Sequence, residues 1–210
     1  MTVTDCDLVH AAARTYSGVP AAWVGMRGAV RVYRSLSSDG VPIFAFEGTH
    51  DPIGWALDFF AIPVPAQGAL QQAVGWVHAG FALALDSVWD DVSAVIEREP
   101  VYALAGHSLG AALAVLATAR MAVQEHPPVR WGAFAPPRVG MEKLVKLVEA
   151  VPGRAWAYGN DPVVGVPFAA PPLWPYYQVA LTKCGKPMPR KWDAHAIGNY
   201  VAAVIAATEG

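Results

Sequence analysis

The stretch Val101-Tyr-Ala-Leu-Ala-Gly-His-Ser-Leu-Gly-Ala-Ala-Leu-Ala114 decides the fold that we expect for this chain. It joins an apolar run to an alanine- and leucine-rich run through Gly106-His107-Ser108-Leu109-Gly110. A G-x-S-x-G pentapeptide between a strand and a helix is typical of a nucleophile elbow, whose serine sits on a sharp turn. Backbone passes close to such a turn, which favours glycine at both ends of the pentapeptide. The stretch therefore predicts that Ser108 is a nucleophile and that the Leu109 N–H, at the positive end of the next helix, helps to bind an oxyanion.

The composition favours an α/β sheet that is covered on both faces. Of the 210 residues, 54% are hydrophobic and only 15% are charged, so a large core can be buried. The formal net charge is −2 and the Lys and Arg residues are scattered, which argues against a nucleic-acid partner. The longest apolar stretches are too short, or too interrupted by proline, to span a bilayer. Cys6 and Cys184 are expected to be free thiols.

The first seven residues carry acidic side chains and no apolar segment, so no signal peptide is visible. On this basis we expect a protein that is cytoplasmic or is released by a non-classical route.

Strands and helices alternate along the chain. Hydrophobic periodicity and turn residues predict helices over 7–16, 77–99, 109–123, 141–151 and 195–208, and strands over 29–36, 41–46, 101–105, 129–135, 154–158 and 176–181. The alternation predicts a mostly parallel sheet with crossover helices. No linker divides the chain, so we expect one domain over residues 1–210. Ligands of such sheets bind beyond the carboxyl ends of the strands, where Ser108 and Asp161 both lie.

A nucleophilic serine needs a base, and the base needs an orienting acid. In hydrolases of this type the order along the chain is serine, acid, histidine, which selects His195 because His126 follows at the far end of the elbow helix. His107 precedes the serine and is expected to point away from it. Asp161, directly after the strand at 154–158, is the preferred acid, and Asp193 is the alternative, with an expected role as the N-cap of the last helix.

A second oxyanion donor is expected in the loop after an early strand. Thr49 follows the strand at 41–46 and can offer its backbone N–H. The alternative is that Thr49 is an ordinary turn residue.

Six ordered blocks of sequence resemble the class 3 lipases, the fungal-lipase-like branch of the α/β-hydrolases. They are Phe46-Glu47-Gly48-Thr49, Val77-His78-Ala79-Gly80-Phe81, the elbow from Gly106 to Ala114, Ala135-Pro136-Pro137-Arg138-Val139-Gly140, Asn160-Asp161-Pro162-Val163 and His195. The resemblance implies an α/β-hydrolase fold and a triad of Ser108, Asp161 and His195. It also implies an oxyanion hole of Thr49 and Leu109 and a lid-like segment at about 50–67.

Two departures from the family pattern concern the site. The family usually has Arg where this chain has Glu47, so a local ion pair must be rebuilt or absent. The tyrosine expected three residues after the histidine is replaced by Gly198, although Tyr200 is near.

The implied activity is hydrolysis of acyl esters, with lipid-like or short-to-medium acyl chains, through an acyl-serine intermediate. Neither a metal nor a cofactor is expected. Apolar side chains in two segments are expected to form the acyl pocket or a surface that meets lipid, or else to pack over the sheet: Trp55, Phe59, Phe60, Phe168 and Trp174. The alternatives are an acyltransferase or a phospholipase with the same triad, and a non-catalytic lipid-binding protein.

Overall fold

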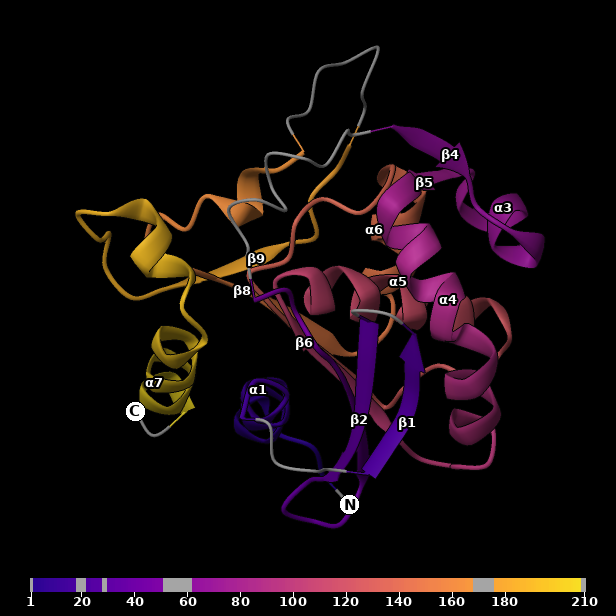
Figure 1. The fold of residues 1–210 in the computed structure, drawn as a ribbon, viewed down its shortest axis with the longest axis horizontal. Coiled ribbons are helices and arrows are strands. Elements are labelled where there is room, and N and C mark those ends of the chain that lie inside the picture. Colours follow the sequence, from indigo (N-terminus) through magenta and orange to yellow (C-terminus); the bar gives the residue numbers. More distant parts are fainter. Residues whose placement is uncertain (1, 18–21, 28–29, 51–61, 168–175, 209–210) are drawn as a thin grey trace.

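The computed structural model describes the chain except for residues 1, 18–21, 28–29, 51–61, 168–175 and 209–210. Within the described residues, a central sheet has the strand order β1-β2-β3-β6-β7-β8-β9 (Figure 1). Its strands are β1 (Ala22–Arg27), β2 (Val30–Leu36), β3 (Pro42–Phe46), β6 (Ala103–His107), β7 (Arg130–Phe134), β8 (Gly153–Tyr158) and β9 (Leu181–Cys184). The first three strands pair antiparallel, and the pairs from β3 to β9 are all parallel. The expectation of a mostly parallel sheet is confirmed.

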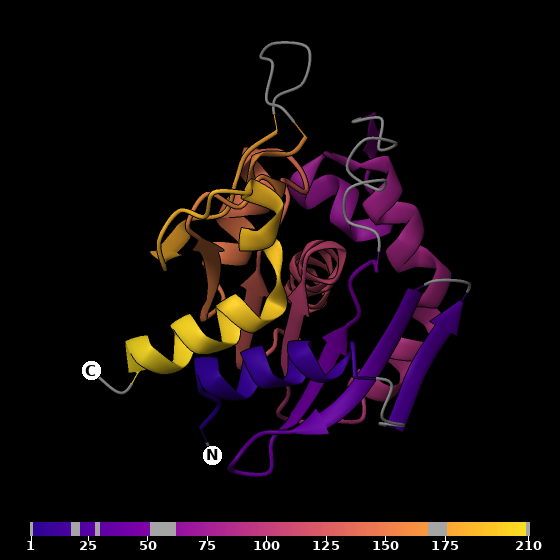
Figure 2. The same ribbon diagram turned by 60° about the vertical axis from the view of Figure 1, so that its left-hand side comes forward.

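Helices cover both faces of this sheet (Figure 2). One face carries α4 (Ala79–Ile96), α5 (Leu109–Val123) and α6 (Glu142–Glu149), and the other carries α1 (Asp5–Arg14) and α7 (Ile197–Thr208). The short helix α3 (Gly68–Val74) packs against α5 and α6. None of the described helices is long and apolar enough to cross a membrane.

The residue types explain where the helices lie. Helix α5 is rich in Ala, Leu and Val, so it can be buried on nearly all sides between the sheet and its neighbouring helices. Helix α1 begins with a capping box, in which the Thr4 hydroxyl accepts from the Asp7 N–H and the Asp7 carboxylate accepts from the Thr4 N–H. Its buried residues Leu8 and Val9 belong to a hydrophobic cluster between the sheet and helices α1 and α7.

Two expectations for individual elements are wrong, and two elements were not predicted. The sequence did not indicate β1 or α3. The helix expected over 77–99 starts only at Ala79, because Trp76–His78 forms β5 and pairs with β4 (Pro63–Pro65). The strand expected over 176–181 is displaced, since Tyr177 makes only an isolated bridge to Gly140 and β9 runs over Leu181–Cys184 beside β8.

Of the lid-like segment expected at about 50–67, residues 51–61 lie outside the described part of the chain, and β4 occupies part of the remainder. Cys6 and Cys184 are both free thiols. No group of three or more metal-ligating side chains occurs among the residues that the structure describes.

Candidate active site

The elbow between β6 and α5 holds Ser108 in a strained backbone conformation, with φ 59° and ψ −124°. A Cβ atom on Gly106 would overlap the carbonyl group of Gly110, and a Cβ atom on Gly110 would overlap the carbonyl oxygen of Phe46. Both glycines are therefore required by close backbone approach. The Ser108 N–H donates to the Phe134 carbonyl at 2.9 Å, which ties the turn to the neighbouring strand β7.

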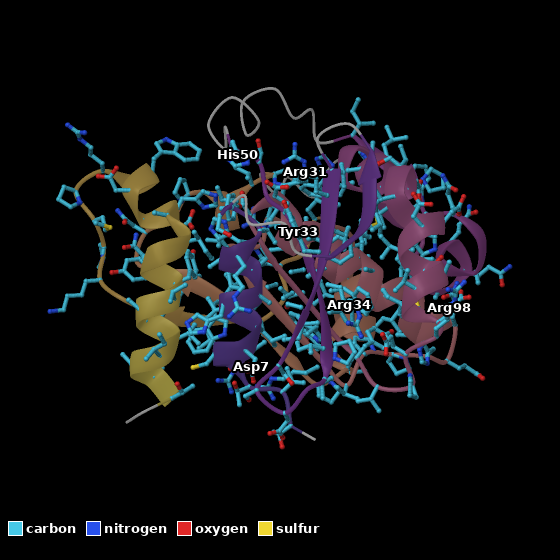
Figure 3. The ribbon with its side chains drawn as sticks, turned by 60° about the horizontal axis from the view of Figure 1, so that its bottom comes forward. Asp7, Arg31, Tyr33, Arg34, His50 and Arg98 are labelled. Carbon is cyan, nitrogen blue, oxygen red and sulfur yellow. The ribbon has the colours of Figure 1, made fainter. Side chains whose placement is uncertain are left out.

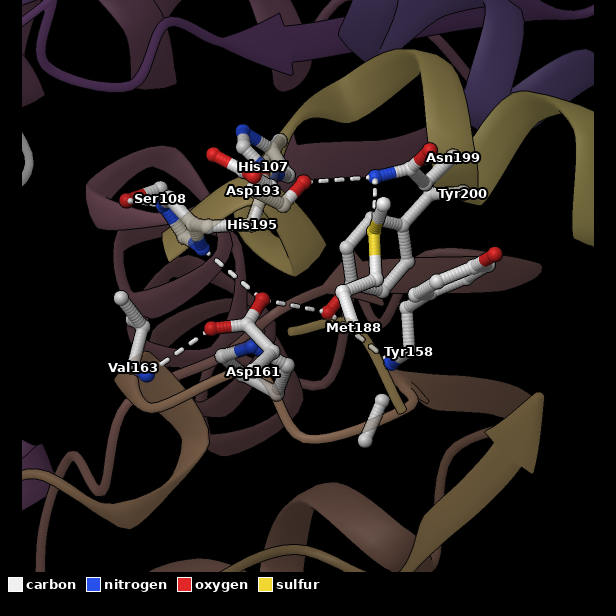
Figure 4. Close-up of polar contacts among 12 residues, drawn as sticks. His107, Ser108, Tyr158, Asp161, Val163, Met188, Asp193, His195, Asn199 and Tyr200 are labelled. Carbon is white, nitrogen blue, oxygen red and sulfur yellow. Dashed lines mark hydrogen bonds and ion pairs between the residues drawn. The ribbon is translucent and has the colours of Figure 1, made fainter. Parts of the chain in front are cut away.

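Ser108, His195 and Asp161 form one hydrogen-bonded chain (Figure 4). His195 Nε2 lies 2.9 Å from Ser108 Oγ, and His195 Nδ1 lies 2.8 Å from Asp161 Oδ2. A carboxylate only accepts hydrogen bonds, so Nδ1 carries the proton and Nε2 is left to accept from the serine hydroxyl. All three residues are buried. In this arrangement the imidazole is oriented to take the serine proton.

The Asp161 carboxylate has further donors. Its Oδ2 accepts from the Tyr200 hydroxyl at 2.6 Å, and its Oδ1 accepts from the Val163 N–H at 2.9 Å (Figure 4). Burial by itself would raise the pKa of Asp161, but the hydrogen bonds from His195, Tyr200 and Val163 bring that pKa below its ordinary value. Asp161 therefore remains a carboxylate around neutral pH and can stabilise a charged imidazole.

Asp193, the alternative acid, does not reach this chain. It lies in the short 3-10 helix η2 (Lys191–His195), and its backbone carbonyl accepts from the Asn199 side chain. Helix α7 begins only at Ile197, so the expected N-cap role for Asp193 is also wrong.

Tyr200 is the residue that anchors the Asp161 carboxylate from α7. Its hydroxyl accepts from the Tyr158 N–H at 3.0 Å and donates to Asp161. Burial, followed by the charge of Asp161, raises the pKa of Tyr200, so the phenol stays protonated and can donate. The sequence signal for this role was only the nearness of a tyrosine to His195.

The candidate oxyanion loop lies beside the elbow because β3 and β6 are parallel neighbours. Phe46 is paired with Gly106, so the loop Glu47–Thr49 and the turn at Ser108 leave the sheet at the same edge. Leu109 is the first residue of α5, and the first N–H groups of a helix have no partner within it. The two predicted donors, Thr49 and Leu109, thus come from adjacent loops.

Glu47 has rebuilt the local ion pair with the opposite polarity from the family pattern. Its partners Arg31, Tyr33 and His50 lie near one another (Figure 3). The Glu47 carboxylate is 3% exposed and lies 2.9 Å from His50 Nε2 and 3.7 Å from Arg31 Nη1. The Tyr33 hydroxyl donates to it at 3.3 Å. The buried charge of Glu47 is therefore matched by groups from strand β2 and from its own loop.

The five apolar residues expected to bind substrate all lie outside the described residues: Trp55, Phe59, Phe60, Phe168 and Trp174. Among the described residues, large exposed apolar side chains include Ile62, Trp76 and Tyr177. The segments that carry them are hydrogen-bonded to one another. The Ala79 N–H donates to the Ile62 carbonyl, and Gly140 bridges both Tyr177 and Val77, the residue after Trp76.

This sheet, with a Ser–His–Asp chain at the carboxyl ends of its parallel strands, has the architecture of a serine hydrolase of the α/β class. The family model for class 3 lipases matches residues 43–170, and the chain belongs to that family.

Two curated relatives match the chain, the secreted mono- and diacylglycerol lipase A of Penicillium cyclopium and that of Penicillium camembertii. Each is 30% identical over 131 residues, which is 60% of this chain and 42% of the relative. The chain thus spans less than half the length of these relatives.

Solved structures of fungal lipases share the fold. A mutant form of MDLA from Penicillium cyclopium has a TM-score of 0.68 at 17% identity and covers 91% of both chains. The triacylglyceride lipase of Rhizomucor miehei has a TM-score of 0.63 at 21% identity, over 78% of this chain and 64% of that one. A third structure belongs to a family of fungal lipases with an unusual buried polar cluster. It has a TM-score of 0.69 at 22% identity, over 86% of this chain and 77% of that one. The expected α/β-hydrolase fold is confirmed.

The expected location is contradicted by these comparisons. Both curated relatives are named as secreted proteins, which conflicts with a cytoplasmic location. The expectation depended only on the lack of an apolar segment in the first seven residues. That is weaker evidence than the names of two related proteins, both of which are described as secreted.

Proposed function

We propose that this protein is a serine carboxylic ester hydrolase of the lipase or esterase type. Ser108 is the nucleophile, His195 the general base and acid, and Asp161 the acid that orients His195. The observation that carries the proposal is the hydrogen-bonded chain from Ser108 through His195 to Asp161, at 2.9 Å and 2.8 Å.

The reaction has two halves. Ser108 Oγ attacks the ester carbonyl carbon while His195 Nε2 takes its proton, and the oxyanion accepts hydrogen bonds from the Thr49 and Leu109 N–H groups. His195 then gives the proton to the leaving alcohol, which leaves an acyl-serine. Water attacks the acyl-serine with His195 as the base, and release of the carboxylic acid restores Ser108. No step in this sequence calls for a metal or a cofactor.

The proposed substrates are lipid-like esters or esters of short-to-medium acyl chains. Family membership and two relatives named as mono- and diacylglycerol lipases support this class. The exposed apolar side chains of Ile62, Trp76 and Tyr177 support contact with a lipid surface. The acyl-pocket role of Trp55, Phe59, Phe60, Phe168 and Trp174 and the lid role of residues 50–67 remain part of the proposal.

The test is hydrolysis of a p-nitrophenyl ester series of increasing acyl length, beside monoacylglycerol, diacylglycerol, triacylglycerol and phospholipid. Ser108→Ala should lower kcat by about 10⁶, because the triad acts as a unit. Ser87→Ala is the matched control, since its hydroxyl bonds only a carbonyl of its own helix and lies on the exposed face of α4. A folded Ser108→Ala protein that keeps most of its activity would refute the assignment.

Two further measurements separate the alternatives. Product analysis with an added alcohol acceptor distinguishes hydrolysis from acyl transfer. Labelling with an organophosphate tests for a reactive serine, and a folded protein without an adduct on Ser108 would favour a non-catalytic lipid-binding protein.

A further inference from the structure

A second hydrogen-bonded chain runs behind the triad. Tyr16, just after helix α1, places its hydroxyl oxygen 2.8 Å from His107 Nδ1. His107 Nε2 lies 2.9 Å from the backbone carbonyl oxygen of His195. His107 is buried, and its ring lies 4.7 Å from that of His195, with 32° between the planes. A residue of the N-terminal segment is thereby connected to the backbone of the proposed base.

The donors and acceptors along this hydrogen-bonded chain are fixed by the His195 carbonyl oxygen at its end. A carbonyl oxygen cannot donate, so His107 Nε2 must carry a proton. Burial, followed by the nearby His195, lowers the pKa of His107 to about 3, so its ring is neutral at ordinary pH. Nδ1 therefore has no proton, and the Tyr16 hydroxyl donates to it.

At its other end, this series of hydrogen bonds reaches the oxyanion loop. Gly48 lies against the Tyr16 hydroxyl, and its backbone N–H acts to lower the pKa of that phenol. A Cβ atom on Gly48 would overlap both the Tyr16 hydroxyl and the His107 carbonyl oxygen, so the loop is packed directly against these two residues. Gly48 immediately precedes Thr49, the proposed oxyanion donor.

The charges around Tyr16 keep it a donor. Burial, followed by the negative charge of Glu47, raises the pKa of Tyr16. Glu47 is in turn held by Arg31, Tyr33 and His50. A negative charge at position 47, where the family pattern has a positive one, therefore favours the protonated phenol that the chain requires.

We infer that Tyr16 and His107 are positioning residues that fix the oxyanion loop relative to the catalytic base. This inference rests on the proposed function. The path runs from the close contact of Gly48 with Tyr16, through the Tyr16–His107 hydrogen bond, to the His195 carbonyl. Ester hydrolysis requires the oxyanion donors and the base at a fixed separation around one tetrahedral carbon, and small errors in that separation lower the rate. The neutral His107 ring adds no positive charge beside His195 when the latter takes up the serine proton.

The test compares Tyr16→Phe with Tyr102→Phe, both of which delete one hydrogen-bonded hydroxyl. The Tyr102 hydroxyl donates to the His126 carbonyl, and Tyr102 precedes β6, at the opposite end of that strand from Ser108. With a soluble p-nitrophenyl ester, Tyr16→Phe should lower kcat by about tenfold and leave KM within about twofold, which corresponds to loss of one hydrogen bond that aligns the reacting groups. Tyr102→Phe should leave kcat unchanged even if it lowers the melting temperature.

An independent readout is the ¹⁵N spectrum of histidine-labelled protein, with His107 assigned from its loss in His107→Gln. The wild-type protein should show His107 protonated on Nε2 alone from about pH 5 to 8. Tyr16→Phe should shift the Nδ1 resonance toward that of an unbonded imidazole nitrogen, and Tyr102→Phe should not.

The inference is overturned if Tyr16→Phe and Tyr102→Phe have the same kcat, if the loss is wholly in KM, or if wild-type His107 carries its proton on Nδ1. A wild-type protein that hydrolyses no ester refutes the proposed function, and with it the positioning role, even where the His107 resonances show the hydrogen bonds intact.

Discussion

Acidification from about pH 7.5 to 5 should destabilise this protein through His78, a buried histidine that the proposed reaction does not use. His78 is 1% exposed, its ring lies 4.3 Å from that of Phe81, and its Nδ1 accepts from the Gly80 N–H at the start of α4. Burial lowers the pKa of His78 from 6.5 to about 4. The folded protein therefore holds this ring neutral at pH values where the unfolded chain protonates it.

The sign and the size follow from proton linkage. Between pH 6.5 and about 4 the unfolded state binds one more proton at this residue than the folded state. The contribution of His78 to the unfolding free energy is therefore complete above pH 6.5 and is lost as the pH falls toward 4. The slope is about 1.4 kcal/mol per pH unit, and pH 5 lies about 1.5 units below the unfolded pKa. The contribution of His78 to the loss is therefore about 2 kcal/mol, a large fraction of the stability of an ordinary domain.

The assay is urea unfolding of wild-type protein and His78→Asn at both pH values. Asn is a good N-cap and does not titrate, so the variant keeps the capping interaction while it removes the proton site. From about pH 7.5 to 5, the wild-type protein should lose about 2 kcal/mol more unfolding free energy than His78→Asn. This comparison does not depend on how the two proteins differ at about pH 7.5. His107, which is also buried and neutral, contributes equally to both proteins and cancels. Equal losses in the two proteins would refute the reasoning.

Four other substitutions have defined outcomes. Asp161→Asn should lower kcat on a p-nitrophenyl ester by about 10⁴, because the amide favours the wrong tautomer of His195. Tyr200→Phe removes a donor from the Asp161 carboxylate and should lower kcat by about tenfold in the same assay, with a smaller effect on KM. Gly106→Ala should cost more than about 3 kcal/mol in unfolding free energy, because its Cβ overlaps backbone, whereas Gly198→Ala, with open space around it, should be neutral or stabilising by up to about 1 kcal/mol.

The part of the site that follows from local sequence was predictable. The elbow needs a strand, a Gly-bounded turn and a helix in direct succession, and each of these has its own residue pattern. The order of Ser108, Asp161 and His195 then places all three at one edge of a parallel sheet, where the structure brings them into one hydrogen-bonded chain. Local motifs and sheet topology favoured this assignment and left Asp193 as the alternative acid.

Strand positions at the rim were less predictable because pairing, and not intrinsic preference, decides them. Residues 176–181 are rich in aromatic and β-branched side chains, yet within that segment Tyr177 makes only an isolated bridge to Gly140. The strand beside β8 is Leu181–Cys184, which includes a polar Thr182 and a charged Lys183. An edge strand has one neighbour and exposed side chains, so its sequence carries little hydrophobic pattern.

The position of Tyr200 shows how a local backbone break brings a tyrosine to Asp161 although Gly198 stands where the family pattern has a tyrosine. In a continuous helix from His195, the residues on the same face would be Gly198 and Asn199, three and four positions later, and neither could replace a phenol. The chain instead leaves the 3-10 helix η2 at Ala196, which is extended with φ −62° and ψ 129°, and α7 begins anew at Ile197. The extended residue resets the helical phase, so the side chain five positions after His195 takes up the position beside Asp161. Because a single backbone dihedral sets this phase, residue spacing alone could not have assigned Tyr200 to the carboxylate.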